Sequence, residues 1–337
     1  MSVTVTKIEN SRLEIKGTID THIFDSHIVK TTTKIVADAE LDGFRKGKAP
    51  EKIVVDKVGE EKILQQSAEA ALQAEWPKVL DEQKIEAIGP AEFHITKLAR
   101  GNPLEWTARV AVMPELALPD WRAIAHKVNT EKDTPTIEVT EKELADTLAY
   151  IQRVRTPEGQ TPPPLDDAYA QSLGNFPTLA ALQDNIKQGI LEEKNGKARD
   201  AHRMKLIEEI AKAATVEIPD IMVDAEQTKM LNELRHSIEE MGLVWDDYLA
   251  HLKKPEAEIR AGFVEDATRR VRVSLTLRQI AQIEATEATS DEVTKRVEAM
   301  LRPYEEKERA QIDRGRVEEY AKGVLRNEKV IELLEIQ

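Results

Sequence analysis

The segment Gly43-Phe44-Arg45-Lys46-Gly47-Lys48-Ala49-Pro50 holds the residue types best suited to binding a charged partner. Glycines around lysines are typical of phosphate-binding loops, but that motif needs four residues between its glycines and a Ser or Thr after the lysine, where the hydroxyl binds magnesium. Three residues separate Gly43 from Gly47, and Ala49 follows Lys48. We therefore exclude nucleotide binding by this motif.

The same segment has the composition of a protein interface. Gly43 and Gly47 permit positive φ angles, so the triplet between them can project on a tight turn. Phe44 beside Arg45 and Lys46 resembles an interface hot spot, which Lys48 and Lys52 extend with further positive charge. In the alternative interpretation Phe44 packs inward to anchor the loop and the cations are merely solvated. Composition leaves both interpretations open.

Other residue types give no chemical motif. The seven histidines form neither an HExxH pair nor another spaced set of metal ligands. The chain has no cysteine, which excludes thiolate nucleophiles, disulfides and cysteine-based metal sites. Acidic pairs such as Glu208-Glu209 lie in charge-rich helical sequence and are interpreted as solvated faces. The sequence thus predicts no catalytic residue, no metal site and no cofactor.

Composition favours long helices. Of the 337 residues, 41% are hydrophobic but only 4% are aromatic, which suits helices packed through aliphatic side chains and predicts an elongated, mostly helical fold. The net charge is −14, and residues 1–113 carry 16 Lys and Arg against 18 Asp and Glu, a local balance of only −2. This charge excludes a general nucleic-acid binder. With no apolar run of membrane-spanning length and no signal peptide, we expect a soluble, cytoplasmic protein without membrane contact.

Periodicity divides the chain into three parts. Residues 1–113 predict an α+β domain in the order ββαααββ: a hairpin over 2–8 and 12–18, helices over about 20–39, 51–58 and 60–83, and two strands within 88–98 and 104–114. In the first helix Ile28 and Val29 are among the residues available for burial.

Residues 114–167 predict a connector. "WRAIAHKVN" (121–129) is interpreted as a strand, Thr140 and Glu143 form a capping box, and the Pro-rich stretch 156–167 is an extended linker with no core of its own. Residues 168–337 predict an all-α domain, with helices over about 179–214, 220–241, 246–253, 255–284, 290–301 and 304–337.

With these elements in place, the chain resembles trigger factor, the ribosome-associated bacterial chaperone family. "GFRKGKAP" matches the family signature Gly-Phe-Arg-x-Gly-Lys-x-Pro at every specified position. "VMPELAL", "TVEIPDIMVDAEQTKM", "RRVRVSLTLRQIAQIE" and "RNEKVIELL" also resemble family segments, so nearly the whole chain is covered.

The resemblance implies a function and partners. The N-terminal domain would dock on the large ribosomal subunit, on a tunnel-exit protein and ribosomal RNA. Phe44, Arg45 and Lys46 would make the contact, with Gly43, Gly47, Lys48 and Pro50 completing the signature. The C-terminal helices would form a body with arms that holds nascent or unfolded chains without ATP. Self-association away from the ribosome is a further family property.

Five of the seven methionines lie in the C-terminal helices, and methionine is frequent on promiscuous binding surfaces, although ordinary core packing explains any single one. Met222, Met230, Met241 and Phe263 are the candidate client contacts.

One departure from the family is large. The family carries an FKBP-type peptidyl-prolyl isomerase domain of roughly 100 residues between the connector and the arms, where this chain has only residues 156–167. We therefore expect a form without that domain and without enzymatic activity. The alternatives are a proline isomerase that works without the usual domain, and a holdase that acts independently of the ribosome.

Overall fold

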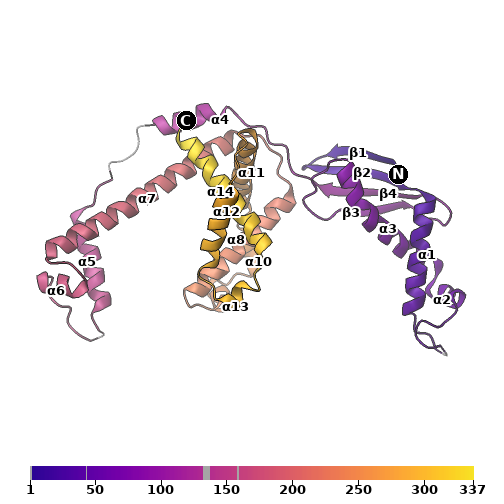
Figure 1. The fold of residues 1–337 in the computed structure, drawn as a ribbon, viewed down its shortest axis with the longest axis horizontal. Helices are drawn as coiled ribbons and strands as arrows, with labels where there is room; N and C mark the ends of the chain where they lie inside the picture. The colour runs from indigo at the N-terminus through magenta and orange to yellow at the C-terminus, as the bar shows by residue number, and fades with distance from the viewer. Residues whose placement is uncertain (1, 43, 132–136, 158) are drawn as a thin grey trace. The chain divides into compact units, whose positions relative to one another are not determined.

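The computed structural model describes residues 2–42, 44–131, 137–157 and 159–337 (Figure 1). The chain divides into two compact units: Met1–Ala117 with Thr215–Leu275, and Leu118–Ala214 with Thr276–Gln337. Within the described ranges there are fourteen helices and one four-stranded sheet. The expected combination of an α+β N-terminal part with a helical remainder is therefore confirmed.

The sheet lies in the first unit and is antiparallel throughout, with the strand order β1-β2-β4-β3. Its strands are β1 Ser2–Ile8, β2 Arg12–Ile19, β3 Glu92–Lys97 and β4 Leu104–Ala111. The predicted hairpin forms, and its turn places Asn10 and Ser11 at φ of 61° and 48°. Alternate residues of β2 and β4, such as Ile15 and Trp106, are buried, so one face of the sheet carries the core.

Helices cover that face (Figure 1). They are α1 Thr21–Asp38 and α3 Glu60–Glu82, while α2 Glu51–Val58 packs against these two helices instead of the sheet. In α1 the buried residues recur every fourth position as Phe24, Ile28 and Thr32, so Val29 falls outside this stripe and is 65% exposed. The expectation that Val29 is available for the core is wrong, because Phe24 fills that role.

The rest of the first unit is helical, with α8 Asp220–Glu240, α9 Trp245–Leu252, α10 Glu256–Ala261 and the start of α11 Val264–Ile283. A core of Leu231, Ile238 and Trp245 joins α8 to α9, and Phe263 packs against it. The single helix expected over 255–284 is broken at 262–263, where Phe263 packs into this core between α10 and α11.

The second unit contains α4 Trp121–Thr130, α5 Glu141–Arg155, α6 Asp167–Leu173, α7 Leu179–Ala213, α12 Ser290–Leu301, α13 Glu306–Arg309 and α14 Arg314–Glu335. The strand expected over 121–129 is wrong, since these residues form α4. The Asp120 carboxylate accepts from the Ala123 N–H at 3.1 Å and begins the helix, and Trp121, Ala125 and Val128 bury one helical stripe.

The Pro-rich stretch folds back on its neighbours. The Gln152 side chain donates to the Pro163 carbonyl, and α6 then begins at Asp167. Ala170 of α6 packs with Leu148 of α5 and Leu182 of α7 in a small core. The linker is therefore not a free extended segment: the Gln160 N–H donates to the Pro157 carbonyl at 3.1 Å, and α6, which begins at the last residue of the stretch, joins a core. No helix in the described part of the chain is long and apolar enough to cross a membrane.

Candidate functional site: an exposed loop beside an apolar groove

Backbone geometry fixes the shape of the loop between α1 and α2. The Gly47 N–H donates to the Ala39 carbonyl at 3.0 Å, and the Lys48 N–H donates to the Arg45 carbonyl at 2.9 Å. Gly47 has φ of +68°, and a Cβ there would lie 2.6 Å from the Ala37 carbonyl oxygen. The expected positive φ is thus confirmed at Gly47. Gly43 lies outside the described residues.

The loop directs its signature side chains outward. Phe44 is 42% exposed, and Arg45, Lys46, Lys48 and Pro50 are exposed as well. The residue that packs inward is Ala49, which is 5% exposed. Sequence reasoning missed this anchor, although a small apolar residue among charged ones was the available signal.

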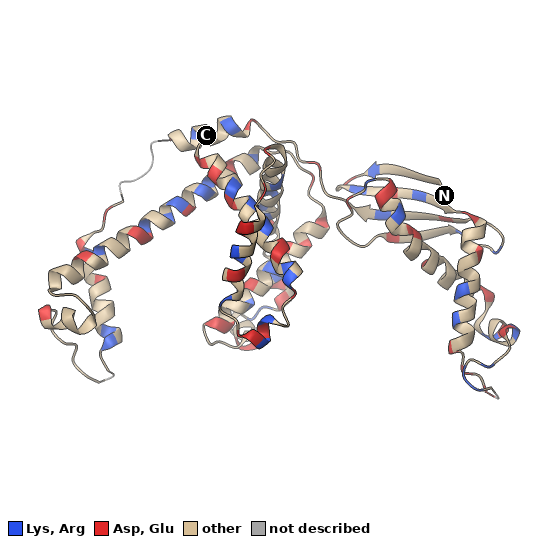
Figure 2. Cartoon of the chain, in the orientation of Figure 1, with Lys and Arg blue, Asp and Glu red and all other residues tan. Residues whose placement is uncertain are grey.

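Charges on the loop are largely unneutralised. Lys46 Nζ lies 3.2 Å from a Glu40 carboxylate oxygen, but both side chains are mostly exposed, and such pairs contribute little. Among the residues that the structure describes, Arg45 and Lys48 have no acidic group within ion-pair distance, and Lys46 is the loop cation that has one. The loop therefore presents a local positive charge. Elsewhere, Figure 2 shows both charge signs interspersed along α7 and α14, as expected for solvated helices.

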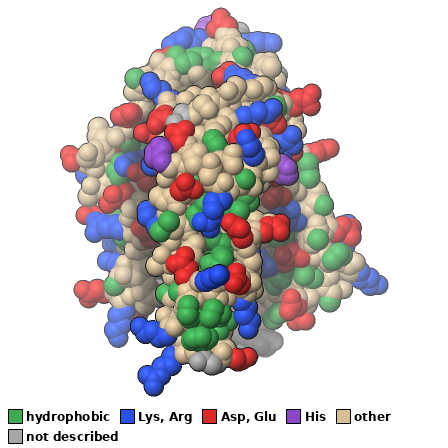
Figure 3. Space-filling view, turned by 90° about the vertical axis from the view of Figure 1, so that its right-hand side faces the viewer, with side chains coloured by type: hydrophobic (Ala, Val, Ile, Leu, Met, Phe, Trp, Pro, Cys, Tyr) green, Lys and Arg blue, Asp and Glu red, His purple; other side chains and the backbone are tan. Residues whose placement is uncertain are grey.

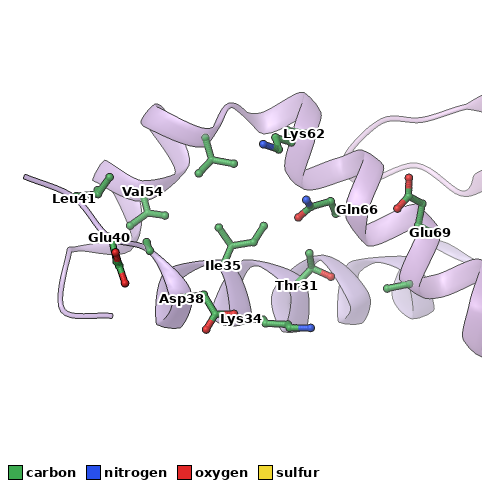
Figure 4. Close-up of a pocket in the computed structure, with 13 residues that line it drawn as sticks. Thr31, Lys34, Ile35, Asp38, Glu40, Leu41, Val54, Lys62, Gln66 and Glu69 are labelled. Atoms are coloured by element: carbon green, nitrogen blue, oxygen red, sulfur yellow. The ribbon is translucent and has the colours of Figure 1, made fainter. Parts of the chain in front are cut away.

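A groove of about 650 Å³ with an apolar centre and a charged rim lies beside the loop, between α1, α2 and α3 (Figure 4). Ile35 of α1 and Val54 of α2 form its floor, while Lys34 and Lys62 lie on its opposite rims. Figure 3 views the molecule from the side that lies on the right in Figure 1. Hydrophobic side chains gather at the lower end of that view, with Lys and Arg next to them. Asp38, Glu40 and Glu69 also line the groove, so its rim carries both charge signs and its apolar part can receive an apolar side chain, while the positive charge lies on the loop.

The candidate client residues differ in exposure. Met241 is 63% exposed, Met222 and Phe263 are half-buried, and Met230 is buried at 9%. Met230 therefore has little surface to offer a client. Sequence reasoning missed Leu243 and Val244, which are 54% and 60% exposed and follow Met241 directly across the turn at Gly242. The unbroken run "MGLV" at a helix end was the signal for this patch. We call Met241, Leu243 and Val244 the α8–α9 tip.

No metal site accompanies the loop. Within the described ranges, no group of three or more His, Asp or Glu residues is arranged to hold a metal ion.

Comparison with known families defines the class of protein. A family model described as "Bacterial trigger factor protein (TF)" matches residues 1–151, and one described as "Bacterial trigger factor protein (TF) C-terminus" matches residues 178–335. These are the models of a chaperone family. The chain belongs to the trigger factor family.

Curated relatives agree along the whole chain. It is 24% identical to a trigger factor of Clostridium tetani, over 99% of this chain and 98% of that protein, and 25% identical to one of Geobacillus sp., over 90% and 91%. The Clostridium tetani alignment has 423 positions against 337 residues here, so at least 86 positions of that relative have no counterpart in this chain. This fits a family member that lacks an internal domain.

A solved structure has the same fold. It is described as "Promiscuous Substrate Recognition in Folding and Assembly Activities of the Trigger Factor Chaperone" and is similar with a TM-score of 0.56 at 16% identity, over 100% of both chains.

Proposed function

We propose that this trigger factor family member is an ATP-independent, cytoplasmic chaperone that docks on the large ribosomal subunit at the tunnel exit and holds nascent or unfolded chains. The observation that carries the docking proposal is the signature loop, in which Gly47 fixes the turn while Phe44, Arg45 and Lys46 remain exposed. A loop so built loses little conformational entropy on binding.

The partner of the loop is a surface with acidic and apolar groups. Arg45 and Lys48 need no internal ion pair to be broken before they meet a carboxylate of a tunnel-exit protein or a phosphate of ribosomal RNA. Because such contacts release counterions from the RNA, binding should weaken as salt is raised. Because the chain as a whole has a net charge of −14, it does not attract anionic partners over its whole surface. Binding of such a partner is therefore confined to the local cationic loop.

We propose that holding uses several weak apolar patches. The α8–α9 tip is the first candidate, because its three side chains are more exposed than those of the other candidate client residues. Several weak contacts on one client add through effective concentration, while each single contact can still release. Met222 and Phe263 stay secondary candidates because they are half-buried.

We infer that the chain has no prolyl isomerase activity of the family type. Residues 152–177 separate the two matched regions, and this stretch is far shorter than a domain of roughly 100 residues. An isomerisation assay on a short X-Pro peptide tests this inference, and clear catalysis at protein concentrations typical for isomerases would overturn it.

Ribosome co-sedimentation tests the docking. The triple variant Phe44→Ala/Arg45→Ala/Lys46→Ala should lose at least about tenfold in affinity, since it removes a hot-spot aromatic and two cations. A matched control, Val29→Ala/Lys30→Ala/Lys57→Ala, removes one exposed apolar and two cationic side chains from the same domain outside the loop. It should bind like the wild type.

Equal binding by wild type and loop variant would overturn the role of the loop. Aggregation suppression by both proteins, without ribosome binding by either, would favour the ribosome-independent holdase.

A further inference from the structure

Strand β1 is an open edge of the sheet. It pairs with β2 through seven consecutive residue pairs without a bulge, and no strand lies on its other side in the described part of the chain. Its sequence, "SVTVTKI", has no proline or glycine and only one charge. Proteins normally protect long edge strands with bulges, prolines or charges, because their unpaired backbone groups are a template for another strand. β1 has almost none of this protection.

The hydrogen-bond pattern identifies which backbone groups face outward. The Ala111 carbonyl accepts from Ile88 N–H at 3.0 Å, on the β3 side of β4. Arg12, which lies opposite Ala111, must therefore direct its N–H and C=O toward β1, where it pairs with Ile8.

Alternation along β1 then leaves the N–H and C=O groups of Val3, Val5 and Lys7 on the outer edge. No backbone hydrogen bond outside the sheet involves residues 2–8 within the described ranges.

Side chains on the same edge are only partly covered. Val5 lies opposite Ile15, and Val3 lies opposite Gly17, so both valines extend the apolar face of the sheet. Ile15 is fully buried and Val3 packs against the same core, but Val5 is 38% exposed. An added strand would satisfy the free backbone groups and bury the exposed side of these valines.

We propose that β1 binds an extended segment of an unfolded polypeptide, which adds to the sheet as a fifth strand. This inference rests on the proposed holding function. The backbone hydrogen bonds would form with any extended client segment. The partly covered valines would add a preference for segments in which every second residue is apolar. A second copy of this chain could also offer a β1 edge, but two copies would each bring a net charge of −14, whereas a client need not be acidic.

The test uses the full chain and a labelled peptide of about twelve residues in which valine alternates with serine, longer than a typical strand. Hydrogen exchange of the wild type should show that the peptide protects the Val3, Val5 and Lys7 amides. The Thr4 and Thr6 amides bond to β2 and serve as internal controls that change little. The same peptide with N-methyl groups on alternate residues lacks donors on one edge and should bind about tenfold more weakly.

Two substitutions at one position separate the backbone from the side chain. Val5→Pro removes an outward N–H and leaves the bonds to β2 intact, so the domain should fold and bind the peptide about tenfold more weakly. Val5→Ala keeps the N–H and should lose about threefold. If Val5→Pro unfolds the domain, the exchange experiment on the wild type still decides the inference.

The outcomes distinguish this inference from the proposed function. If the wild type suppresses aggregation but the three amides gain no protection, the edge is not a client site and the holding function stands. If the wild type neither suppresses aggregation nor binds the peptide, both fail. If the protein alone protects these amides and its mass rises with concentration, a second copy occupies the edge and the client proposal is overturned.

Discussion

Lys194 of α7 places its ammonium 2.6 Å from one carboxylate oxygen of Glu143 on α5. The same ammonium donates to the Glu138 carbonyl at 2.8 Å, and the Glu143 carboxylate also accepts from the Thr140 N–H at 2.8 Å. One carboxylate thus caps α5 and ties it to α7. The hydrogen bond from Lys194, followed by those from Thr140, lowers the pKa of Glu143 from 4.5 to about 2.

The same arrangement occurs a second time in this unit. Lys329 of α14 donates to Glu292 at 2.8 Å and to the Glu287 carbonyl at 3.1 Å, while Glu292 closes a capping box with Thr289 at the start of α12. The pKa of Glu292 is likewise lowered to about 2, chiefly by Lys329. Both sites share the pattern Glu-x-Thr-x-x-Glu, at 138–143 and 287–292. In both places a lysine of the next long helix therefore bonds to the carboxylate that caps the start of a shorter helix. We call this pairing of lysine and capping glutamate the clamp.

The first prediction concerns the titration of Glu143. Because its pKa in the folded chain lies below the ordinary 4.5, the clamp contributes its full stability above about pH 4.5 and loses it as the pH falls toward 2. Lys194→Met should raise the pKa of Glu143 back toward 4.5, since it removes the largest cause of the lowering. Carboxyl NMR of Glu143 measures this change. Lys142→Met, one residue from Glu143 and exposed, should leave the titration unchanged.

A second prediction separates backbone strain from steric clash in the signature loop. Gly47→Ala forces a non-glycine residue to positive φ and brings its Cβ to 2.6 Å from the Ala37 carbonyl oxygen. Gly59 also has a positive φ, of 90°, but the Cβ of an alanine at this position would have no heavy atom within 4 Å. Gly59→Ala should cost about 1–2 kcal/mol of unfolding free energy from strain alone, and Gly47→Ala should cost more. Denaturant unfolding measures both, and an equal cost would mean that the Ala37 contact relaxes freely.

The Gly47 variant should also weaken ribosome co-sedimentation more than Gly59→Ala does. The clash displaces the turn that presents Phe44, whereas Gly59 lies beyond α2 at the start of α3.

Sequence patterns predict what is local in this protein. The capping box at Thr140, the end of α7 and the exposed character of the loop's cations all follow from residues a few positions apart. Lys194 and Lys329 could not be predicted, because they meet their glutamates from 51 and 37 residues away. The wrong prediction of a strand over 121–129 has a related origin. Trp121 and Val128 are common in strands as well as in helices, and these residues form a helix because packing against the rest of the fold buries one stripe of α4.

The third prediction concerns the attachment of α7 to α14. Arg203 donates to both Glu335 carboxylate oxygens, at 2.7 and 2.8 Å, and both side chains are about three-quarters buried. Arg203→Ala should lower the unfolding free energy by about 1–2 kcal/mol, as for charge-assisted hydrogen bonds near a surface. Arg203→Lys should recover only part of it, because a lysine cannot make the two parallel bonds. Lys197→Ala, which removes an exposed cation on the same helix whose ion pair with Glu193 is also exposed, should change little.

The pH dependence of this pair has a definite sign. The hydrogen bond from Arg203 lowers the pKa of Glu335, although burial opposes it. The pair therefore stabilises the fold above the ordinary carboxyl pKa of 4.5 and loses that contribution as the pH falls through the lowered value. The difference between wild type and Arg203→Ala should shrink on acidification. A constant difference down to the lowest pH at which the chain folds would mean that Arg203 acts by packing alone.

The fourth prediction tests the α8–α9 tip as a client surface. Met241→Ser/Leu243→Ser/Val244→Ser removes three adjacent, exposed apolar side chains, and the fold should lose little because none of them lies in the core. Aggregation suppression of a chemically unfolded client should then require several-fold more chaperone, because one of several additive weak contacts is lost. Val264→Ser/Ile283→Ser/Ile336→Ser removes three exposed apolar side chains scattered over α11 and the end of α14, and should suppress aggregation like the wild type. If both triple variants lose activity equally, clients respond to total apolar surface, and the tip has no special role in holding them.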